Sequence, residues 1–367
     1  MSYRWPPFRY PARTAVEFAP GALRRVGTLA RERGFRRTLL VSDRGMIGAG
    51  FVDRALRALQ EAGVEAFPFH NFGENPDTSM VEAGRAFATP LQIDSLIGLG
   101  GGSSLDCTKA INFVFVNGGS MKDYHGYDRA SKPLLPMIGV PTTTGTGSEA
   151  QSYALISDAE THLKMACGAP TAAFGAVILD PELVVSQPRS VLAAAGYDAI
   201  SHALETFVTT RRTGWSDGLA REAWRLLSSS YERMLTTPDL DAASGMQLGA
   251  YFAGAAIEAS MLGAAHACAN PLTASYGTIH GQAIAVMLPQ VVRWNGEACY
   301  AELTESLDAR LDQLAAVAGL PRMLRELGAR EADLPGLAEA AGKQWTGKFN
   351  PRDFDAAGAL ELYRCAY

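Results

Sequence analysis

The chain has 367 residues, of which 47% are hydrophobic and 19% are charged, with a formal net charge of -5 and a pI near 5.8. This length exceeds what a single hydrophobic core usually supports, so we expect two domains. A mildly acidic chain without a basic stripe is a poor partner for nucleic acid or for an anionic membrane, and we expect neither.

The cysteines and the first residues indicate where the protein resides. The number of cysteines, five, is odd, and no Cys-x-x-Cys pair occurs, which is typical of reduced thiols in a cytoplasm. The opening sequence MSYRWPPFRYP has no apolar core followed by a small-residue cleavage site, so no signal peptide is expected. A cytoplasmic protein is therefore predicted.

Hydrophobic periodicity changes near residue 183. Before it, helical stretches alternate with the short apolar segments TLLVSD, AFPFH, SLIGLG, MIGV and AVILD, which is typical of a wound, mainly parallel sheet. After it, long helical patterns follow with almost no strand candidate. We predict an α/β domain over residues 1–182 and an all-helical domain over residues 183–367, with a hinge in the proline-containing segment DPELVVSQPRS.

Asp43 is the first candidate binding residue, at the end of the predicted strand RTLLVSD. An acidic side chain at such a strand end accepts hydrogen bonds from the ribose hydroxyls of an adenosine and repels a 2′-phosphate, which favours NAD over NADP. By itself, an ordinary turn or helix cap explains Asp43 equally well.

A glycine-rich turn joins a predicted strand to a helix in QIDSLIGLGGGSSLDCTKAINF. Backbone N–H groups at a helix N-terminus bind phosphate, and the three glycines allow the backbone to approach an anion closely. Ser103 and Ser104 can cap or donate, while Asp106 and Lys109 lie on the first helical turns. The standard dinucleotide fingerprint does not fit, because position 103 is Ser and the acidic residue lies upstream.

A second strand end carries hydroxyl side chains in PMIGVPTTTGTGSEAQ. Clusters of Thr, Gly and Ser are also what any loop contains. Two such turns after two buried strands nevertheless favour a nucleotide site that uses both.

One carboxylate and three histidines form a candidate metal site. Asp198 and His202 are spaced i, i+4 and share a helix face, whereas His266 and His280 lie in separate Gly- and Ala-rich segments. Each histidine taken singly is more simply explained as a core residue bonded to a backbone carbonyl. As a set, these side chains form a complete ligand set for a divalent transition metal. Cys268 is left out, because i, i+2 neighbours on a helix point apart.

The segment GAYFAGAAIEASMLGAAHACANPL is apolar enough for a membrane-spanning interpretation. It contains Glu258, His266 and Asn270, and its small residues suit close packing inside a protein. We predict a buried helix.

Taken together, these motifs resemble the iron-containing (group III) alcohol dehydrogenase family. The resemblance is carried by GGGSSLDCTK, PTTTGTGSE, ILDPEL, DAISHALE and HACANPLTASYGTIHG, and it spans nearly the whole chain. It implies a dehydroquinate-synthase-like fold, with an α/β nucleotide-binding domain, an all-α domain, and NAD and the metal in the cleft between them. It also implies an NAD-dependent alcohol dehydrogenase or aldehyde reductase that forms a homodimer or a larger homo-oligomer.

The resemblance also implies roles for individual residues. The metal, Fe²⁺ or alternatively Zn²⁺, would be held by Asp198, His202, His266 and His280. The residues implied to contact NAD are Gly100, Gly101, Gly102, Ser103, Asp106, Thr142, Thr143, Thr146 and Lys164, with Asp43 discriminating against NADP. The metal would polarise the oxygen of a small alcohol or aldehyde while hydride passes to or from nicotinamide C4.

The chain departs from the family pattern at two positions. Many relatives have a histidine four residues after the third ligand, thought to help relay the alcohol proton, where this chain has Asn270. Asparagine does not titrate near neutrality, so we expect water or the ribose hydroxyls to carry the proton, with His266, His280 and Asn270 at the reacting centre. Trp345 stands where relatives often place a smaller residue; it narrows the substrate pocket or simply packs in a helix.

Two other functions are compatible with the motifs. A cyclising lyase of the same superfamily would need basic residues to hold an acidic, phosphorylated substrate, and HACANPLTASYGTIHG contains no Lys or Arg. A non-catalytic relative that keeps the fold is disfavoured by the intact ligand set and favoured mildly by Asn270.

Overall fold

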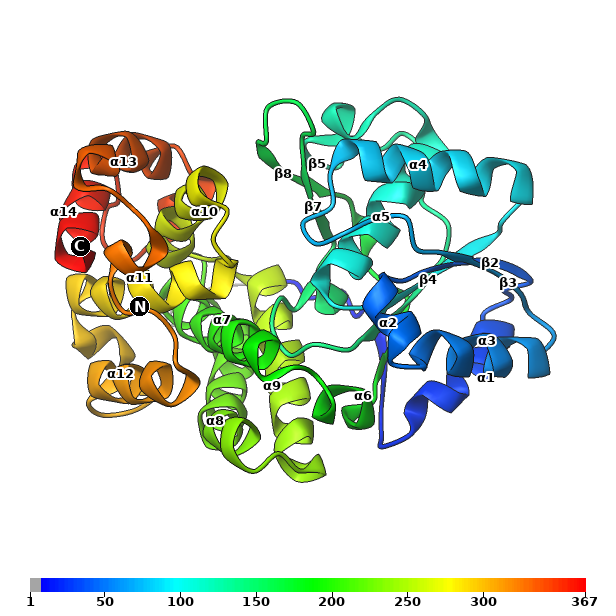
Figure 1. Ribbon diagram of the computed structural model, residues 1–367, viewed down its shortest axis with the longest axis horizontal. Coiled ribbons are helices and arrows are strands. Elements are labelled where there is room, and N and C mark those ends of the chain that lie inside the picture. The colour runs from blue at the N-terminus through cyan, green and yellow to red at the C-terminus, as the bar shows by residue number, and fades with distance from the viewer. Residues whose placement is uncertain (1–7) are drawn as a thin grey trace, which may run out of the picture. The chain divides into compact units, whose positions relative to one another are not determined.

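The computed structural model describes residues 8–367, and this range divides into two compact units (Figure 1). The sheet unit contains Pro11–Thr143 and Ser148–Ser186, and the helical unit contains residues 8–10, Thr144–Gly147 and Gln187–Tyr367. The last of the chain's passages from one unit to the other lies between Ser186 and Gln187, within DPELVVSQPRS. The expectation of no signal peptide concerns in part residues 1–7, which lie outside the described residues.

Six parallel strands form the centre of the sheet unit, in the order β1-β9-β6-β4-β2-β3. Their bounds are Ala15–Phe18 for β1, Arg37–Val41 for β2, Glu65–Phe69 for β3, Ser95–Gly100 for β4, Met137–Pro141 for β6 and Ala176–Leu179 for β9. The inner strands β4, β6 and β9 are buried at every residue, as expected of a parallel sheet covered on both faces. The predicted wound parallel sheet is confirmed.

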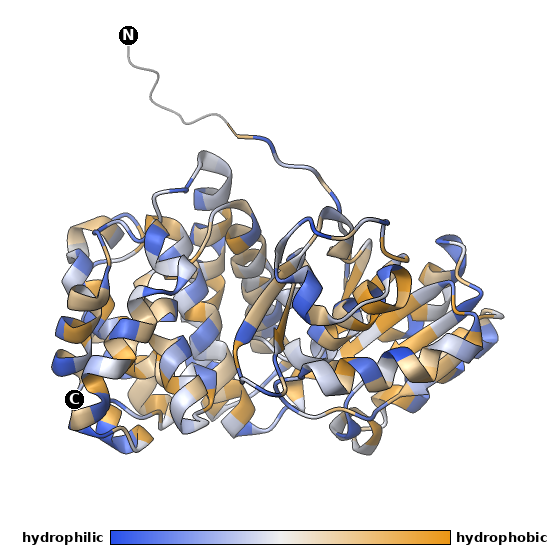
Figure 2. Cartoon of the chain, turned by 90° about the horizontal axis from the view of Figure 1, so that it is seen from above, coloured by the Kyte–Doolittle hydropathy of each residue, from blue (hydrophilic) through white to orange (hydrophobic). Residues whose placement is uncertain are grey.

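Helices cover both faces of this sheet. On β4, Ile97 and Leu99 belong to the same buried cluster as Val26 and Leu59, which come from α1 and α3. The intervening Gly98 faces α5 on the other side, since a Cβ there would lie 2.7 Å from Thr108 Oγ1. In Figure 2 the strands are largely hydrophobic, whereas the helices also carry hydrophilic residues. The helices of this unit are α1 Val26–Glu32, α2 Arg44–Gly48, α3 Phe51–Glu61, α4 Thr78–Ala88, α5 Gly102–Asn117 and α6 Pro181–Val185.

A second, smaller sheet has the strand order β5-β8-β7. Strand β8 (Lys164–Gly168) pairs parallel to β5 (Gly126–Tyr127) and antiparallel to β7 (Tyr153–Ser157). No strand is predicted from the sequence in these segments, so this small sheet adds to the predicted architecture.

The buried carboxylate of Asp180 ties the end of the main sheet together. Its Oδ1 accepts hydrogen bonds from the backbone N–H groups of Gly21 (2.9 Å) and Glu182 (3.1 Å), and its Oδ2 accepts one from Leu23 (2.9 Å). Asp180 is therefore both the N-cap of α6 and the anchor of the segment that follows β1.

The helical unit is arranged around α7 (Arg189–Val208), of which 16 of 20 residues are buried. A helix that is buried on all sides lies at the centre of its unit, and α7 contacts α8, α9, α11 and α12. The remaining helices are α8 Gly214–Thr236, α9 Leu240–Ala259, α10 Ala264–Tyr276, α11 His280–Asn295, α12 Leu307–Ala318, α13 Leu334–Gly342 and α14 Ala356–Ala366. Within the described residues all strands precede Asp180, in agreement with the predicted change in periodicity.

The apolar segment predicted as one buried helix is two helices, α9 and α10, bent by 104°. The prediction of a single helix was wrong because the chain turns at Gly263, where a Cβ would lie 3.0 Å from Asn350 Oδ1 and 3.1 Å from Glu205 Oε1. Those two oxygens accept the N–H groups of Ala264 and Ala265 and so begin a new helix. No single helix among the described residues is long and apolar enough to span a membrane, and only this bent pair passes that test together.

The Asp180 contacts predict a large effect on stability. Asp180→Ala leaves two buried N–H groups and one partly buried N–H group without their charged acceptor, and we expect it to lower the free energy of unfolding by about 3 kcal/mol. Asp77→Ala, which removes the half-buried N-cap of α4, is the matched control and should cost about 1 kcal/mol. Urea denaturation of both variants measures the difference; equal losses would contradict the anchoring role of Asp180.

Candidate functional site

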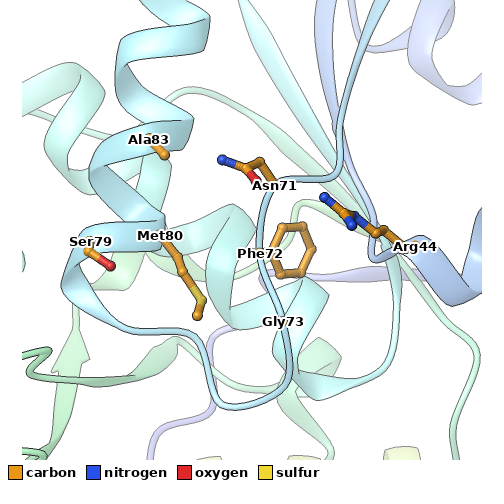
Figure 3. A pocket seen from close by; sticks show the side chains of 7 residues that line it. All are labelled: Arg44, Asn71, Phe72, Gly73, Ser79, Met80 and Ala83. Carbon is orange, nitrogen blue, oxygen red and sulfur yellow. The ribbon is translucent and has the colours of Figure 1, made fainter.

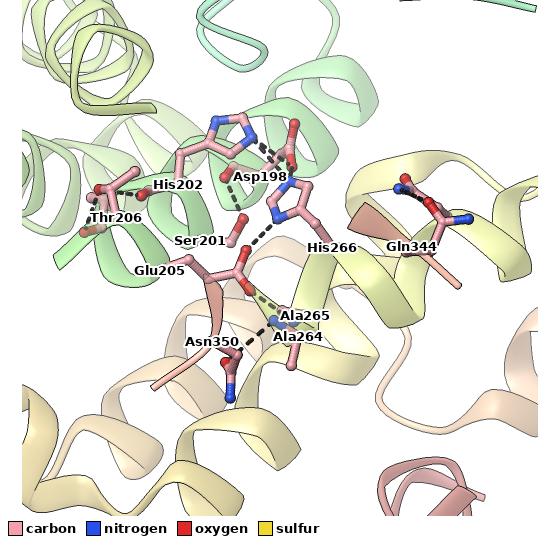
Figure 4. Close-up of polar contacts among 12 residues, drawn as sticks. Asp198, Ser201, His202, Glu205, Thr206, Ala264, Ala265, His266, Gln344 and Asn350 are labelled. Carbon is pink, nitrogen blue, oxygen red and sulfur yellow. Dashed lines mark hydrogen bonds and ion pairs between the residues drawn. The ribbon is translucent and has the colours of Figure 1, made fainter. Parts of the chain in front are cut away.

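The site is built on one face of α7. Asp198, His202 and Glu205 lie at relative positions 0, 4 and 7 of that helix. At about 100° per residue, these positions fall within an arc of about 60°. All three side chains are buried, and they point toward α10 (Figure 4). The predicted i, i+4 pair therefore has a third member on the same face.

His266 on α10 meets this face of α7. Asp198 Oδ1 lies 3.4 Å from both His202 Nε2 and His266 Nε2, and the two Nε2 atoms are 3.1 Å apart. The two rings stack with centroids 4.9 Å apart. The structure thus brings three of the four predicted metal ligands to one buried point.

His280, the fourth predicted ligand, lies at the edge of this group. Its Nε2 is 3.8 Å from Asp198 Oδ1, and its side chain is 25% exposed, compared with 8% or less for the other three. Its position follows from the close approach of α11 to α7, because a Cβ on Gly281 would lie 2.0 Å from the carbonyl oxygen of Ala194. His280 therefore marks the open side of the group.

The donor set fits a divalent metal ion. Ligand atoms around one tetrahedral ion with bonds of about 2.1 Å are separated by about 3.4 Å, and the observed separations of 3.1–3.8 Å bracket that value. Asp198 Oδ1 is buried and has no hydrogen-bond partner within normal geometry. A buried carboxylate oxygen that faces three imidazole nitrogens is better explained by a shared cation than by packing.

The electrostatics of the group are strongly coupled. Burial alone would raise the pKa of Asp198, but His202, His266 and His280 outweigh it and hold that pKa well below its usual range. Burial lowers the pKa of His202 below its usual value. Burial also opposes protonation of His266, yet Glu205 and Asp198 together raise the pKa of its ring to about 9. The neighbourhood therefore favours positive charge beside the carboxylates.

Glu205 also belongs to this site, although it was not predicted from the sequence. Its Oε2 forms a very short contact with His266 Nδ1, and its Oε1 accepts the backbone N–H of Ala265 at 2.7 Å. The available signal was its spacing of seven residues from Asp198, which is the same face of a helix two turns on.

Asn270 lies one turn beyond His266 on α10 and is half-buried. Its Nδ2 donates to Gln344 Oε1 at 3.0 Å. The neighbouring Trp345 begins the short 3₁₀ helix η9 (Trp345–Phe349), is 40% exposed, and stands edge-on to Phe349. Trp345 therefore lies in a short helix and contacts Phe349 with its ring partly exposed, while its narrowing of the substrate pocket stays a prediction.

The glycine turn of the sheet unit lies between β4 and α5, next to Asp43. Asp43 Oδ2 accepts a hydrogen bond from Ser104 Oγ (3.0 Å), and Oδ1 accepts one from the N–H of Gly45 (2.8 Å), which caps α2. Gly100 has a φ of +146°, and a Cβ there would come within 2.3 Å of Ser104 Oγ. Asp43 thus is a helix cap and, at the same time, borders the glycine turn.

Of the other predicted cofactor residues, some border the glycine turn and others lie elsewhere in the structure. Thr143 lies beside Gly101, since a Cβ on that glycine would be 3.2 Å from it, and Thr142 donates its N–H to the carbonyl of Gly100 (3.0 Å). Ser103 Oγ accepts the N–H of Asn75 at 3.2 Å. Thr146 belongs to the helical unit, whereas Gly102 is the first residue of α5 and Lys164 is an exposed residue at the start of β8 in the sheet unit.

Asp106 faces a buried polar cluster behind this turn. Its Oδ1 accepts Ser148 Oγ at 2.6 Å, and the fully buried Lys109 donates to Ser148 Oγ and to three backbone carbonyls. Burial raises the pKa of Asp106, with Lys109 opposing the change. Burial also raises the pKa of the adjacent Glu149 to about 7. These contacts give Asp106 a structural role in addition to the predicted one.

A pocket of about 310 Å³ lies at the carboxyl ends of β2 and β3 (Figure 3). It is lined by Arg44, Asn71, Phe72, Gly73, Ser79, Met80 and Ala83. None of these lining residues was predicted from the sequence as part of a binding site. The available signal was that HNFGEN follows the predicted strand AFPFH, and neighbouring parallel strands end at the same edge of a sheet.

Both halves of the chain match family models. The model described as "Iron-containing alcohol dehydrogenase" matches residues 13–181, and the model described as "Fe-containing alcohol dehydrogenase family, C-terminal" matches residues 192–367.

Individual relatives agree with these matches. The chain is 32% identical to 1,3-propanediol dehydrogenase of Klebsiella pneumoniae, with 100% of both chains covered. It is 30% identical to an NAD-dependent methanol dehydrogenase of Bacillus methanolicus, covering 90% of this chain and 92% of that one. A solved structure of a 1,3-propanediol oxidoreductase superposes with a TM-score of 0.94 at 31% identity, covering 99% and 100% of the two chains.

The environment of Glu149 predicts a pH dependence of stability. Its pKa is about 7 in the folded protein and 4.5 in the unfolded chain, so its contribution is fully present below pH 4.5 and is lost as the pH rises through 7. A difference of this size corresponds to about 3 kcal/mol. Glu149→Gln should remove that loss, and urea denaturation between pH 4.5 and 8 measures it. Identical pH slopes for the variant and the native protein would contradict the assignment.

Proposed function

The chain belongs to the iron-containing alcohol dehydrogenase family, and we propose that it is a metal-dependent, NAD(H)-linked enzyme that interconverts a small alcohol and its aldehyde. The proposal is carried by the convergence of Asp198 Oδ1 with the Nε2 atoms of His202 and His266 at one buried point. When bound there, a divalent metal supplies a Lewis acid for the substrate oxygen, and NAD supplies the hydride acceptor.

The protein's part in this reaction is to hold charge and to orient groups. Asp198, His202, His266 and His280 would be the metal ligands, with the more exposed His280 on the side from which substrate approaches. We take the ion to be Fe²⁺ because of the family; three imidazoles and a carboxylate also bind Zn²⁺.

NAD binding is proposed for the sheet unit. The glycine turn at the start of α5 offers backbone N–H groups to the pyrophosphate, and Thr142 and Thr143 border that turn. The pocket lined by Arg44 and Phe72 adjoins Asp43 along the chain and has room for the adenosine. The NAD-dependent methanol dehydrogenase among the relatives supports the choice of cofactor.

Asn270 offers a hydrogen bond at the reacting centre but no titrating proton. One N–H of its Nδ2 is donated to Gln344, so its carbonyl oxygen and its second N–H have capacity to orient a hydroxyl group. The alcohol proton would then leave through water or through the ribose hydroxyls of the cofactor.

We further infer a cytoplasmic homo-oligomer. The five cysteines are all free thiols in the structure, which suits a reducing compartment. Light scattering coupled to size-exclusion chromatography tests the expectation of a homodimer or a larger assembly.

The first test is metal dependence of turnover. Protein stripped with a chelator should lose NADH formation across a panel of small alcohols, including 1,3-propanediol, and should regain it on loading with Fe²⁺ under nitrogen or with Zn²⁺. Turnover that survives stripping would refute a metal-dependent reaction. Measurable NAD binding without turnover under any metal would instead indicate a non-catalytic relative.

Removing a single ligand tests the assignment of the site. His202→Ala should lower kcat/KM by more than about 100-fold, because loss of an outer partner alone costs up to that much, while NADH affinity measured by fluorescence stays within twofold. His125→Ala, which removes an exposed histidine outside the group, is the control and should behave like the native protein. Comparable turnover in both variants would contradict the ligand assignment.

The departure at position 270 predicts a change in pH profile. With Asn270 we expect no ionisation of this side chain in the profile of kcat/KM. Asn270→His should introduce an ionisation into this profile at pH ~6.5, the usual pKa of a histidine. Steady-state measurement of kcat/KM from pH 5.5 to 9, for the native protein and the variant, tests this expectation. An unchanged profile would show that position 270 does not take part in proton transfer.

A further inference from the structure

We propose that Glu205 is a positioning residue for the metal site, fixing both the tautomer and the orientation of the ligand His266. The inference rests on the proposed metal-dependent function, since it assigns a partner to one of the proposed ligands. Glu205 is 2% exposed and lies on the same face of α7 as Asp198 and His202.

The contact with His266 decides which ring nitrogen is free. Glu205 Oε2 accepts the hydrogen bond of Nδ1–H, so the lone pair of the neutral ring lies on Nε2. Nε2 is the atom that lies 3.4 Å from Asp198 Oδ1 and 3.1 Å from His202 Nε2. A carboxylate behind the ring therefore presents the metal-binding nitrogen to the other ligands.

The second oxygen of Glu205 fixes the helix that carries the ring. Glu205 Oε1 accepts the N–H of Ala265 at 2.7 Å in the first turn of α10. This turn has no cap of its own, because Gly263 stands at its N-cap position without a side chain. One carboxylate thus anchors both the backbone beside His266 and the ring of His266, which leaves the ligand little freedom to rotate away.

A helix cap alone does not require a carboxylate at this position. The adjacent N–H, that of Ala264, is accepted at 3.3 Å by the neutral amide oxygen of Asn350. Glu205 differs from Asn350 in having two acceptor oxygens, one for the backbone and one for the histidine ring. The two residues cap the same helix, and only Glu205 contacts a proposed ligand, so they form a matched pair.

Glu205→Gln separates the two roles because an amide has a single acceptor oxygen. If that oxygen accepts the Ala265 N–H, the amide nitrogen faces Nδ1, which favours the tautomer with its proton on Nε2 and blocks ligation. If it accepts Nδ1–H, two donors face each other at Ala265. Either arrangement weakens the metal site, and we expect a 10- to 100-fold loss of metal affinity, the range typical of outer partners of metal ligands.

The experiment measures Zn²⁺ affinity of the full chain by competition with a chromogenic chelator, together with the visible spectrum of the Co²⁺-loaded protein. Glu205→Gln should bind Zn²⁺ 10- to 100-fold more weakly and show an altered Co²⁺ spectrum. Asn350→Ala should lower the thermal midpoint while leaving Zn²⁺ affinity within twofold of the native value. Glu205→Asp, which keeps two acceptor oxygens on a shorter side chain, should weaken binding by a smaller factor and provides the measurement if the glutamine variant does not fold.

The outcomes distinguish the inference from the function on which it rests. Unchanged Zn²⁺ affinity and an unchanged Co²⁺ spectrum in the Glu205 variants, with a thermal midpoint lowered as in Asn350→Ala, would overturn the positioning role and leave only a helix cap. Failure of the native protein itself to bind Zn²⁺ or Co²⁺ would overturn the metal site and this inference together.

Discussion

A carboxylate buried against imidazole rings is the constraint on which the helical unit depends. Asp198 Oδ1 has three ring nitrogens within 3.8 Å and no ordinary hydrogen-bond partner, an arrangement that costs free energy unless positive charge is shared there. Glu205, behind His266, favours positive charge on that ring, and the donor set fits a divalent ion that would supply more positive charge. The Asp198 carboxylate and the histidine rings are thus arranged around one common point and do not form separate ion pairs.

The same constraint explains the composition of α7 and its neighbours. Ligands from three helices can reach one point only if the helix backbones approach closely, and small residues permit this. Gly196 has room for no side chain, because a Cβ would lie 2.6 Å from Tyr231, and Gly281 lies against the backbone of Ala194. These two glycines therefore permit the close helix packing that brings the proposed ligands of α7 and α11 together.

Much of the fold was predictable because its signal is local. The five apolar segments predicted as strands are β2, β3, β4, β6 and β9, and the loss of strands after them marks the helical half. The edge strand β1 was missed because its four residues, Ala15–Phe18, are largely exposed and show no apolar run. The break between α9 and α10 was missed because it depends on Glu205 and Asn350, which are 60 and 86 residues away from the N–H groups they accept.

The candidate site shows the same division between local and distant information. Residue type and spacing indicated the proposed ligands Asp198, His202, His266 and His280, since the chain has only six histidines and three of them lie in apolar, Gly- and Ala-rich surroundings. The side chains that support such donors are fixed by tertiary packing. Ser148 contacts Asp106 across 42 residues, and this contact makes a predicted cofactor residue also part of a buried polar cluster. The sequence therefore predicts donor atoms for a metal, whereas the contacts that hold such atoms in place join segments far apart in the chain.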